Sequence, residues 1–506
     1  MSHIARSTLI VAIFFGLEKL LGFLRQVIIA RQFGLSPELD AFNAANNIPD
    51  LIFALISGGA LAIAFIPVLT EYLDKSGRSA MWDLFSRVAN LIFLVTAGLS
   101  ILVAIYARQM VSWRLGIAPG FTAEQQALVA DLMRLNLIAT LLFSLSGLAI
   151  AGLQSNQHFF LPALAPSMYD LGTLFGVVIL APVSGYQIGP LQLPAYGMGI
   201  YGLVYGTILG AALFLGVQIP GLLRYQFRWV PRIDLRNPGV RQVLALMLPR
   251  ALTVLFIYAI FLIQDNLASR LETGAVSSLV YGWLFMQVPE TLIGTAIATV
   301  LLPTISTQIA RGARDAFQST LNTTLRVILA LTIPSAILVA LVIPAAVGIL
   351  DFDAAGTRMV TWVSRLFLLG LMGHSLLEVA VRSFYAQQDA RTPLITAALN
   401  AAIFTVLGIA LAFSLGAPGI ALANSLAFTS QAILLLVLLN RQFAGVLKVG
   451  GTLLRVVPAS LAAGLLAFGL LQLPLPALPL AALALLAGGL LILPFIWPEI
   501  NLLRRL

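Results

Sequence analysis

Long apolar runs recur along the whole chain, separated by short polar segments. A helix of about 20 apolar residues crosses the ~30 Å hydrocarbon core of a bilayer. A transmembrane β-barrel would instead show alternating segments of about 10 residues, and we find no such alternation. Only 10% of the residues are charged, against about 25% in a soluble protein. These features predict an all-α membrane protein.

About fourteen transmembrane helices are expected from the hydrophobic pattern. Their ranges are 7–30, 41–70, 84–107, 130–152, 160–183, 197–222, 240–264, 275–307, 318–345, 359–382, 392–414, 418–440, 450–472 and 477–497. An even number of spans puts both termini on the same side of the membrane.

Basic residues indicate which side that is. The loops on the side of the termini hold most of them, and the densest stretch is the linker at 222–242, LLRYQFRWVPRIDLRNPGVRQ. The opposite side holds only Arg31, Arg108, Arg114, Arg270 and Arg358. The positive-inside rule therefore predicts cytoplasmic termini. The same placement explains the net charge of +9 without a nucleic-acid partner.

Several kinds of chemistry lack the residues they need. The chain has no cysteine, and its three histidines, His3, His158 and His374, are far apart in sequence. We therefore expect no metal site and no cofactor. The sequence also shows no paired catalytic aspartates and no filter-like glycine run, so an enzyme or a channel is less favoured than a transporter.

Two halves of the chain resemble each other. Segment 31–52 aligns with 270–293, which pairs Gly34 with Gly274 and Pro49 with Pro289. Segment 153–170 aligns with 384–400, with Pro162 over Pro393. Matching segments start on the same side of the membrane, which predicts two parallel-repeat six-helix lobes around a central cavity. The expected domains are 1–230 and 231–447, followed by two appended helices in 448–506.

The first expected span carries a polar face. Glu18, Lys19, Gly22, Arg25 and Gln26 fall within roughly a 120° arc at 100° per residue. Ionisable groups inside a membrane cost several kcal/mol unless they are paired or wetted. We interpret this face as the lining of a cavity. The alternative is an internal charge network that only holds helices together.

The second expected span is also polar at its start, with DAFNAANNIPDLI at 40–52. Asp40 and Asn46 are candidate cavity residues, although Asp40 could instead cap the helix. Pro49 and Gly59 would bend the helix.

Other candidates lie further along the chain. Arg250 is a candidate cavity residue, and Asp170, Pro289 and Glu290 are candidate structural or gating residues. Asp170 is a candidate conformational lock. We expect Arg326 and Arg455, which lie near span ends, to snorkel toward the headgroups.

Three motifs carry a family resemblance. The first is LLGFLRQVIIARQFG, the second is DAF at 40–42 followed by IP at 48–49, and the third is FYAQQDARTP. With these motifs the chain resembles the MurJ/MviN family of lipid II flippases, which belongs to the multidrug/oligosaccharidyl-lipid/polysaccharide exporter superfamily. A weaker motif, Phe-x-x-Pro-Ala-x-x-Pro, occupies 159–166. The resemblance covers nearly the whole chain.

This resemblance implies a flippase for the undecaprenyl-diphosphate-linked peptidoglycan precursor in the bacterial plasma membrane. Membrane lipids and the cell-wall synthesis machinery are the implied partners. No ATP-binding loop is present, so membrane potential or an ion gradient is the expected driving force. Alternatives are a flippase for another polyprenyl-linked oligosaccharide, a cation-coupled exporter of small molecules, or a scaffold protein.

Site residues are carried over by position. Arg25 and Asp40 match charged residues that the family uses, and Lys19 stands where the family usually has arginine. Phe53 and Leu284 occupy positions that often carry arginine, and Gly58 replaces an acidic residue. The chain thus has fewer fixed cations for a diphosphate, which Arg250 would compensate. The appended helices, apolar from Val456 to Trp497, either form a groove for the lipid tail or only pack.

Overall fold

A computed structural model describes residues 3–56 and 59–503, with side chains described except at 3–13, 15, 59–64, 188, 191, 248–250, 253 and 503. The chain divides into two compact units, Met1–Asn266 and Leu267–Leu506. The expected domain boundaries at 230 and 447 stay predictions, because compactness does not show which helices act together.

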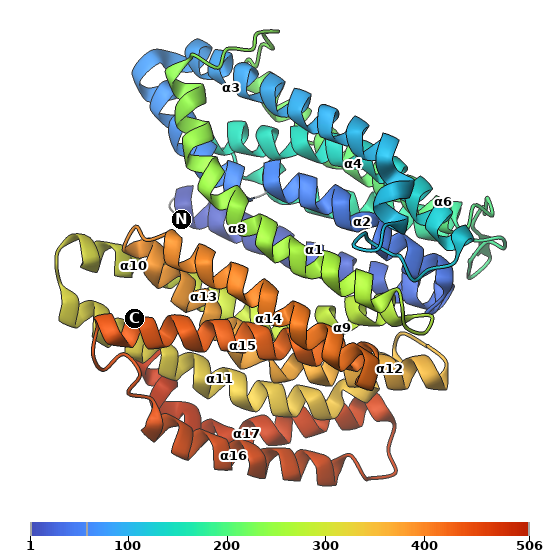
Figure 1. The fold of residues 1–506 in the computed structure, drawn as a ribbon, viewed down its shortest axis with the longest axis vertical. Coiled ribbons are helices and arrows are strands. Elements are labelled where there is room, and N and C mark those ends of the chain that lie inside the picture. Colours follow the sequence, from blue (N-terminus) through green and yellow to red (C-terminus); the bar gives the residue numbers. More distant parts are fainter. Residues whose placement is uncertain (1–2, 57–58, 504–506) are drawn as a thin grey trace. The chain divides into compact units, whose positions relative to one another are not determined.

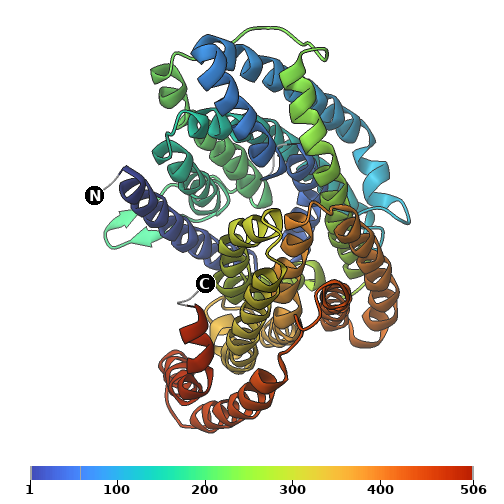
Figure 2. The same cartoon turned by 90° about the vertical axis from the view of Figure 1, so that its left-hand side faces the viewer.

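The first unit contains long helices that run beside one another (Figure 1). Its elements are α1 (His3–Phe33), α2 (Pro37–Ile56), α3 (Gly59–Ser112), α4 (Ala123–Ser155), α5 (Phe160–Phe175), the π-helix η1 (Gly176–Leu180), β1 (Gln187–Ile188), β2 (Leu191–Gln192), α6 (Ile200–Gly216), α7 (Ile219–Arg224) and most of α8 (Pro238–Ala268). The two strands form a small antiparallel hairpin that projects beyond the helices (Figure 2). Tyr186, just before the hairpin, donates a 3.1 Å hydrogen bond to Gln32 near the end of α1.

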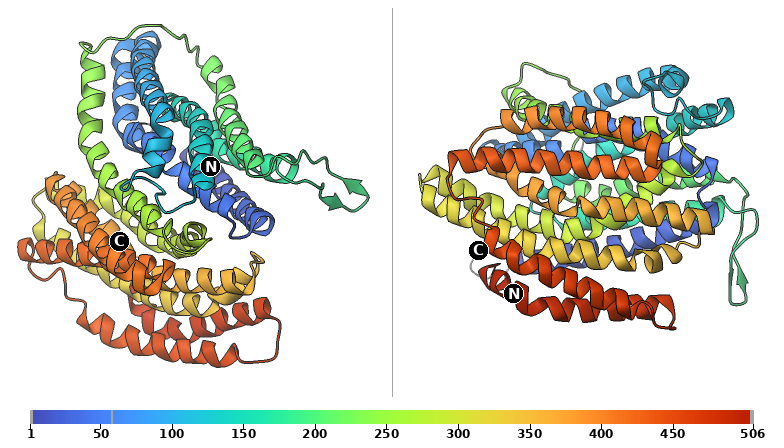
Figure 3. Two further views of the ribbon diagram at one scale, coloured as in Figure 1. Left: turned by 45° about the vertical axis from the view of Figure 1, so that its right-hand side comes forward. Right: turned by 60° about the horizontal axis from the view of Figure 1, so that its bottom comes forward.

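The described residues of the second unit form helices joined by short loops, without a strand. Its elements are α9 (Ala275–Glu290), the π-helix η2 (Thr291–Thr295), α10 (Ala296–Ala310), α11 (Arg314–Gly348), α12 (Ala354–Leu369), α13 (Leu371–Ala386), α14 (Arg391–Leu415), α15 (Ala417–Gln442), α16 (Gly450–Leu470) and α17 (Ala477–Leu503). The last two lie side by side as an antiparallel pair (Figure 3). They pack on α11 through a buried cluster that includes Leu338, Val456 and Ala484.

The expected all-helical membrane fold is confirmed. Each expected span falls largely on helix within the described residues. Ten helices there are long and apolar enough to cross a bilayer, or eleven if α12 and α13, bent by 41°, form one span. The count of fourteen therefore stays approximate. Gly77, at φ 80°, breaks the long α3 helix into two parts.

The two aligned halves share unusual backbone conformations. Gly34 and Gly274, which the sequences align, both have positive φ, 60° and 88°, and each lies just before a helix. Gly199 and Gly416 likewise precede α6 and α15 with φ of 55° and 68°. Glycine takes this conformation without steric cost. The repeat is therefore visible in the local structure of each unit.

A second shared conformation occurs in the aligned turns after α4 and α13. Gln157 and Gln388 have φ of 57° and 60°, which is uncommon for a side chain with Cβ. The next residue in the second turn, Asp389, accepts hydrogen bonds from the backbone N–H groups of Arg391 and Thr392 at 2.9 and 3.0 Å. Burial raises the pKa of Asp389, but the bonds from Thr392 and Arg391 outweigh it and hold the pKa below its usual value.

Glycines bring α5 and α6 into backbone contact. A Cβ added at Gly172 would lie 2.3 Å from the Cα of Gly210, and one at Gly206 would lie 2.6 Å from the Cα of Gly176. Small residues four apart allow such close helix packing in membranes, where the hydrophobic effect does not drive helices together. This contact fixes α5, the helix that carries Asp170, against α6.

We predict that Gly206→Ala destabilises the protein. The added methyl meets backbone rather than a movable side chain, so the expected cost is about 1–3 kcal/mol. The thermal unfolding midpoint of the purified protein in detergent measures this effect. Gly98→Ala in α3 is the control, because no heavy atom lies within 4 Å of its added Cβ. Equal midpoints for the two variants would contradict the predicted close contact.

Candidate functional site

An ion pair joins α1 to α5 in the first unit. The Nη1 of Arg25 lies 2.7 Å from the Oδ1 of Asp170, and the side chains are 17% and 3% exposed. The Arg25 guanidinium also lies over the ring of Tyr169, 5.1 Å from its centroid. Both contacts come from one turn of α5. Arg25 is thus held by a carboxylate and an aromatic face of the same helix.

The rest of the polar face of α1 lies near this pair. A Cβ at Gly22 would lie 3.8 Å from the Oδ2 of Asp170, so Gly22 lies against this carboxylate. Glu18 and Lys19 pair with each other at 3.3 Å, and the Lys19 side chain is 60% exposed. The polar face therefore contacts α5 through Arg25 and keeps one accessible cation at Lys19.

Aromatic rings continue from Tyr169 toward α2. The Tyr169 ring lies 5.3 Å from that of Phe143 in α4, which lies 5.7 Å from that of Phe53. Phe53 occupies a position where the resemblance leads us to expect arginine. Here it extends a hydrophobic ring cluster that supports the helix turn carrying Asp170. The position is used for packing in this structure rather than for charge.

The polar start of α2 is paired with two neighbouring helices. Asn136 in α4 donates a 2.6 Å hydrogen bond to Asn46, and Asn47 donates one to Asp265 in α8. Asp40 is buried in the first turn. The capping residue is Ser36, whose hydroxyl accepts the N–H of Leu39 at 3.2 Å. The alternative in which Asp40 caps this helix is therefore wrong.

Three predicted site residues remain in the first unit, one each in α2, α3 and α8. Pro49 is buried inside α2, and its carbonyl accepts a 3.5 Å hydrogen bond from Thr140. The side-chain surroundings of Gly59 and Arg250 lie outside the described residues. Gly58 also lies outside them.

In the second unit, Pro289 and Glu290 end α9 immediately before the π-helix η2. The hydroxyl of Thr295 donates to Glu290 at 3.1 Å. Glu378 and Arg382 of α13 form an ion pair at 3.0 Å, and Arg382 also donates to the Thr295 carbonyl at 3.5 Å. π-helical turns often mark functional positions. These contacts place one acidic and one basic group of α13 beside the π-helical turn.

The sequence analysis missed one buried cluster, at Glu499. This residue is 1% exposed and lies beyond the apolar stretch that ends at Trp497. Its carboxylate lies 3.0 Å from Arg326, accepts a 2.9 Å hydrogen bond from Thr452 and pairs with Arg455. Arg326 and Arg455 therefore do not simply snorkel, as the sequence suggested. The clue was that two arginines near span ends need an anion.

Comparisons with known proteins identify the family. The family model described as "Lipid II flippase MurJ" matches residues 29–478. The lipid II flippase MurJ of Burkholderia cenocepacia is 32% identical over 403 residues, which cover 77% of this chain and 75% of that protein. The probable lipid II flippase MurJ of Rhizobium meliloti is 30% identical over 432 residues, covering 83% and 77%.

Solved structures share the fold. A lipid II flippase MurJ in an inward closed conformation has a TM-score of 0.80 at 23% identity, covering 98% of this chain and 100% of that one. An inward-facing multidrug transporter of the MATE family has a TM-score of 0.69 at 13% identity, covering 86% and 96%. The chain belongs to the lipid II flippase MurJ family. With its many apolar helices, it is a bacterial inner membrane protein of a transporter family.

We predict energetic coupling between Arg25 and Asp170. Removing one partner leaves a buried, unpaired charge, which costs about 3–5 kcal/mol. Arg25→Ala and Asp170→Ala together should cost less than the sum of the single variants, by about 0.5–3 kcal/mol. The free energy of unfolding in mixed micelles gives this double-mutant cycle. The control cycle uses Lys75 and Glu71, an exposed pair at 2.8 Å, where a much weaker coupling is expected because solvent screens the charges. Strict additivity at Arg25 and Asp170 would show that the pair does not form.

We also predict that Glu499→Ala loosens the appended helices. The substitution leaves Arg326 and Arg455 without their shared carboxylate in a poorly wetted site. Limited proteolysis in detergent should cut the loop between α16 and α17, or that before α16, faster than in the unmodified protein. Gln472→Ala, an exposed change in the loop between these helices, is the control. Unchanged cleavage would mean that apolar packing alone holds α16 and α17.

Proposed function

We propose that this protein is a lipid II flippase. It moves the undecaprenyl-diphosphate-linked peptidoglycan precursor from the cytoplasmic to the outer leaflet by alternating access, with both of its termini in the cytoplasm. The family match over residues 29–478 supports this proposal. The observation that carries the mechanism is the pair between Arg25 and Asp170 on the polar face of α1.

The pair suggests how a diphosphate is bound and released. A lone arginine inside the membrane is costly, so Arg25 takes the Asp170 carboxylate when no substrate is present. A diphosphate offers several anionic oxygens, and the planar fork of a guanidinium can bind two of them at once. We propose that the substrate displaces Asp170 from Arg25. This exchange keeps Arg25 paired with an anion at each stage. It also couples substrate binding to the loss of the ion pair that joins α1 to α5.

Lys19 extends this proposed phosphate site. It lies six residues before Arg25 on the same polar face, and its side chain is 60% exposed. An exposed ammonium attracts the anionic headgroup at a distance, whereas Arg25 supplies directed hydrogen bonds. Asp40 and Asn46 are proposed to contact the sugar and peptide part of the headgroup. Pro49 and the π-turn after Pro289 and Glu290 are proposed bending points.

The driving force is proposed to be the membrane potential or an ion gradient, without a bound cofactor. One elementary charge that crosses the membrane exchanges about 2.3 kcal/mol per 100 mV. The substrate's diphosphate carries negative charge, so a potential that is negative inside favours its outward movement directly.

We predict that Arg25→Ala abolishes lipid II flipping, because the diphosphate loses its directed partner. The measurement is lipid II in the outer leaflet of bacteria that are depleted of their own flippase and express this chain. Arg25→Lys keeps the charge but loses the two-pronged contact, so a partial activity is expected.

Arg358→Ala is the matched control, since this exposed arginine of α12 lies outside the proposed site. Equal amounts of each variant in the membrane fraction are required. Normal flipping by Arg25→Ala would refute the proposed role of Arg25. Absence of flipping by the unmodified chain would turn attention to other polyprenyl-linked oligosaccharides, given Phe53 and Leu284 at positions where arginine is usual.

A further inference from the structure

The first unit has an apolar pocket remote from Arg25. Its volume is about 410 Å³, within the range of small-molecule sites. Its lining comes from α3, α4, α6, α7 and the segment after α7, and consists of Phe85, Ala89, Asn90, Phe93, Leu145, Leu148, Ala149, Leu215, Leu222, Phe227 and Trp229. Asn90 is the one residue of this lining with a polar side chain apart from the indole N–H of Trp229. Phe93 and Trp229 are 43% and 62% exposed, so the pocket opens to the surface of the unit.

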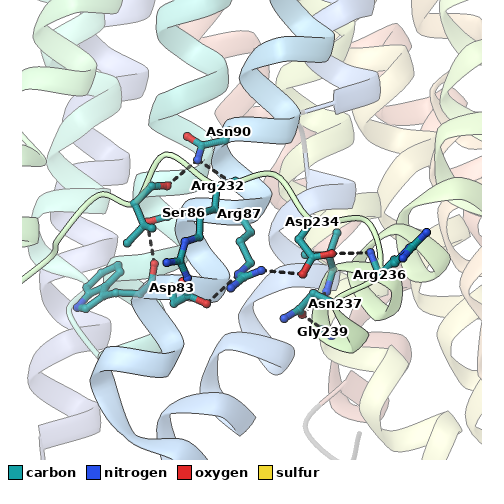
Figure 4. Close-up of polar contacts among 12 residues, drawn as sticks. Asp83, Ser86, Arg87, Asn90, Arg232, Asp234, Arg236, Asn237 and Gly239 are labelled. Carbon is teal, nitrogen blue, oxygen red and sulfur yellow. Dashed lines mark hydrogen bonds and ion pairs between the residues drawn. The ribbon is translucent and has the colours of Figure 1, made fainter.

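The linker segment, residues 225–237, forms one edge of this pocket and is fixed on α3. Asn90 donates hydrogen bonds to the carbonyls of Val230 and Arg232 at 2.7 and 3.0 Å and accepts one from the Trp229 indole at 2.7 Å. Arg87 pairs with Asp234 at 2.8 Å, as Figure 4 shows. The polar groups of the pocket are thus used up in holding the linker segment. What remains for an occupant is apolar wall.

Positive charge surrounds the same edge. Arg228 and Arg232 lie on either side of Trp229 and Val230, and both side chains are exposed. Within the described part of the chain, neither side chain forms an ion pair. Asp234, the nearest acidic residue along the linker segment, already pairs with Arg87. An apolar pocket therefore opens beside two uncompensated guanidinium groups.

We propose that this pocket binds one anionic phospholipid of the leaflet that contacts the linker segment. An acyl chain fills the apolar pocket, and Arg228 and Arg232 bind the phosphate of the headgroup. This site is separate from the proposed flippase site and does not depend on the protein's substrate.

Three observations favour a phospholipid over other occupants. The pocket lies where expected spans meet the basic linker, which is the level of the headgroups. Trp229 has the amphipathic side chain that is enriched at this level. A soluble ligand would need polar partners inside the pocket, and Asn90, its one amide, is occupied by the linker segment.

The test uses a phosphatidylglycerol probe with a diazirine near the end of one acyl chain. The full-length protein is reconstituted in vesicles, irradiated and digested, and the labelled peptides are identified by mass spectrometry. We expect labelling at 85–93 and 145–149. A phosphatidylcholine probe with the same chains should label these segments more weakly, by about fivefold for each arginine that contacts the headgroup.

Two variants separate the two parts of the site. Ala89→Trp places an indole in the pocket, so it should abolish labelling at 145–149 by both probes. Arg228→Gln with Arg232→Gln should instead remove only the preference for phosphatidylglycerol. Within the described residues, the side chains of these exposed arginines form no hydrogen bond or ion pair, so this variant remains informative if Ala89→Trp does not fold.

Matched controls are Leu102→Trp on exposed α3 surface and Arg311→Gln with Arg314→Gln at the end of α10 and start of α11. Neither should change the labelling pattern. Equal labelling by the two probes, or labelling at 145–149 that survives in folded Ala89→Trp, would overturn the proposal. Lipid II flipping is measured separately, so loss of flipping with normal labelling would count only against the proposed function.

Discussion

The structure depends on the high cost of an unpaired polar group in a membrane. Hydrocarbon offers no water to satisfy a charge or an amide, so a charged or amide side chain is stabilised by a partner in another helix. Arg25 finds Asp170, Asn46 finds Asn136, and Glu499 gathers Arg326 and Arg455. Apolar surfaces of different helices are alike and could pack in many combinations, whereas each of these polar contacts joins one particular pair of helices. Polar residues thus specify which helices meet.

Much of the fold could be predicted because its signals are local. A span is recognised from its own apolar residues, and the repeat from aligned motifs such as those around Pro162 and Pro393. The left-handed turns at Gln157 and Gln388 show that this alignment reflects a shared backbone path. The number of spans is less certain, because breaks such as that between α12 and α13 do not interrupt the apolar pattern.

The site was harder to predict because its partners are distant in sequence. Periodicity placed Lys19, Gly22 and Arg25 on one face of α1, but Asp170 is 145 residues from Arg25. Nothing local says that the two meet. The role of Phe53 was also hidden, since a ring that packs on Phe143 and a ring that faces a cavity give the same sequence pattern. Glu499 escaped notice because it follows a long apolar stretch.

The glycine contact between α5 and α6 limits how these helices can slide. Gly172 and Gly176 face Gly210 and Gly206, with equal spacing of four residues on both helices. A small shift along the axis would drive larger neighbouring side chains into the opposing backbone. The next allowed register is one repeat of four residues away, about 6 Å. Sliding of α5 along α6 is therefore restricted to steps of one glycine repeat, and so is any change in the position of Asp170 along α6.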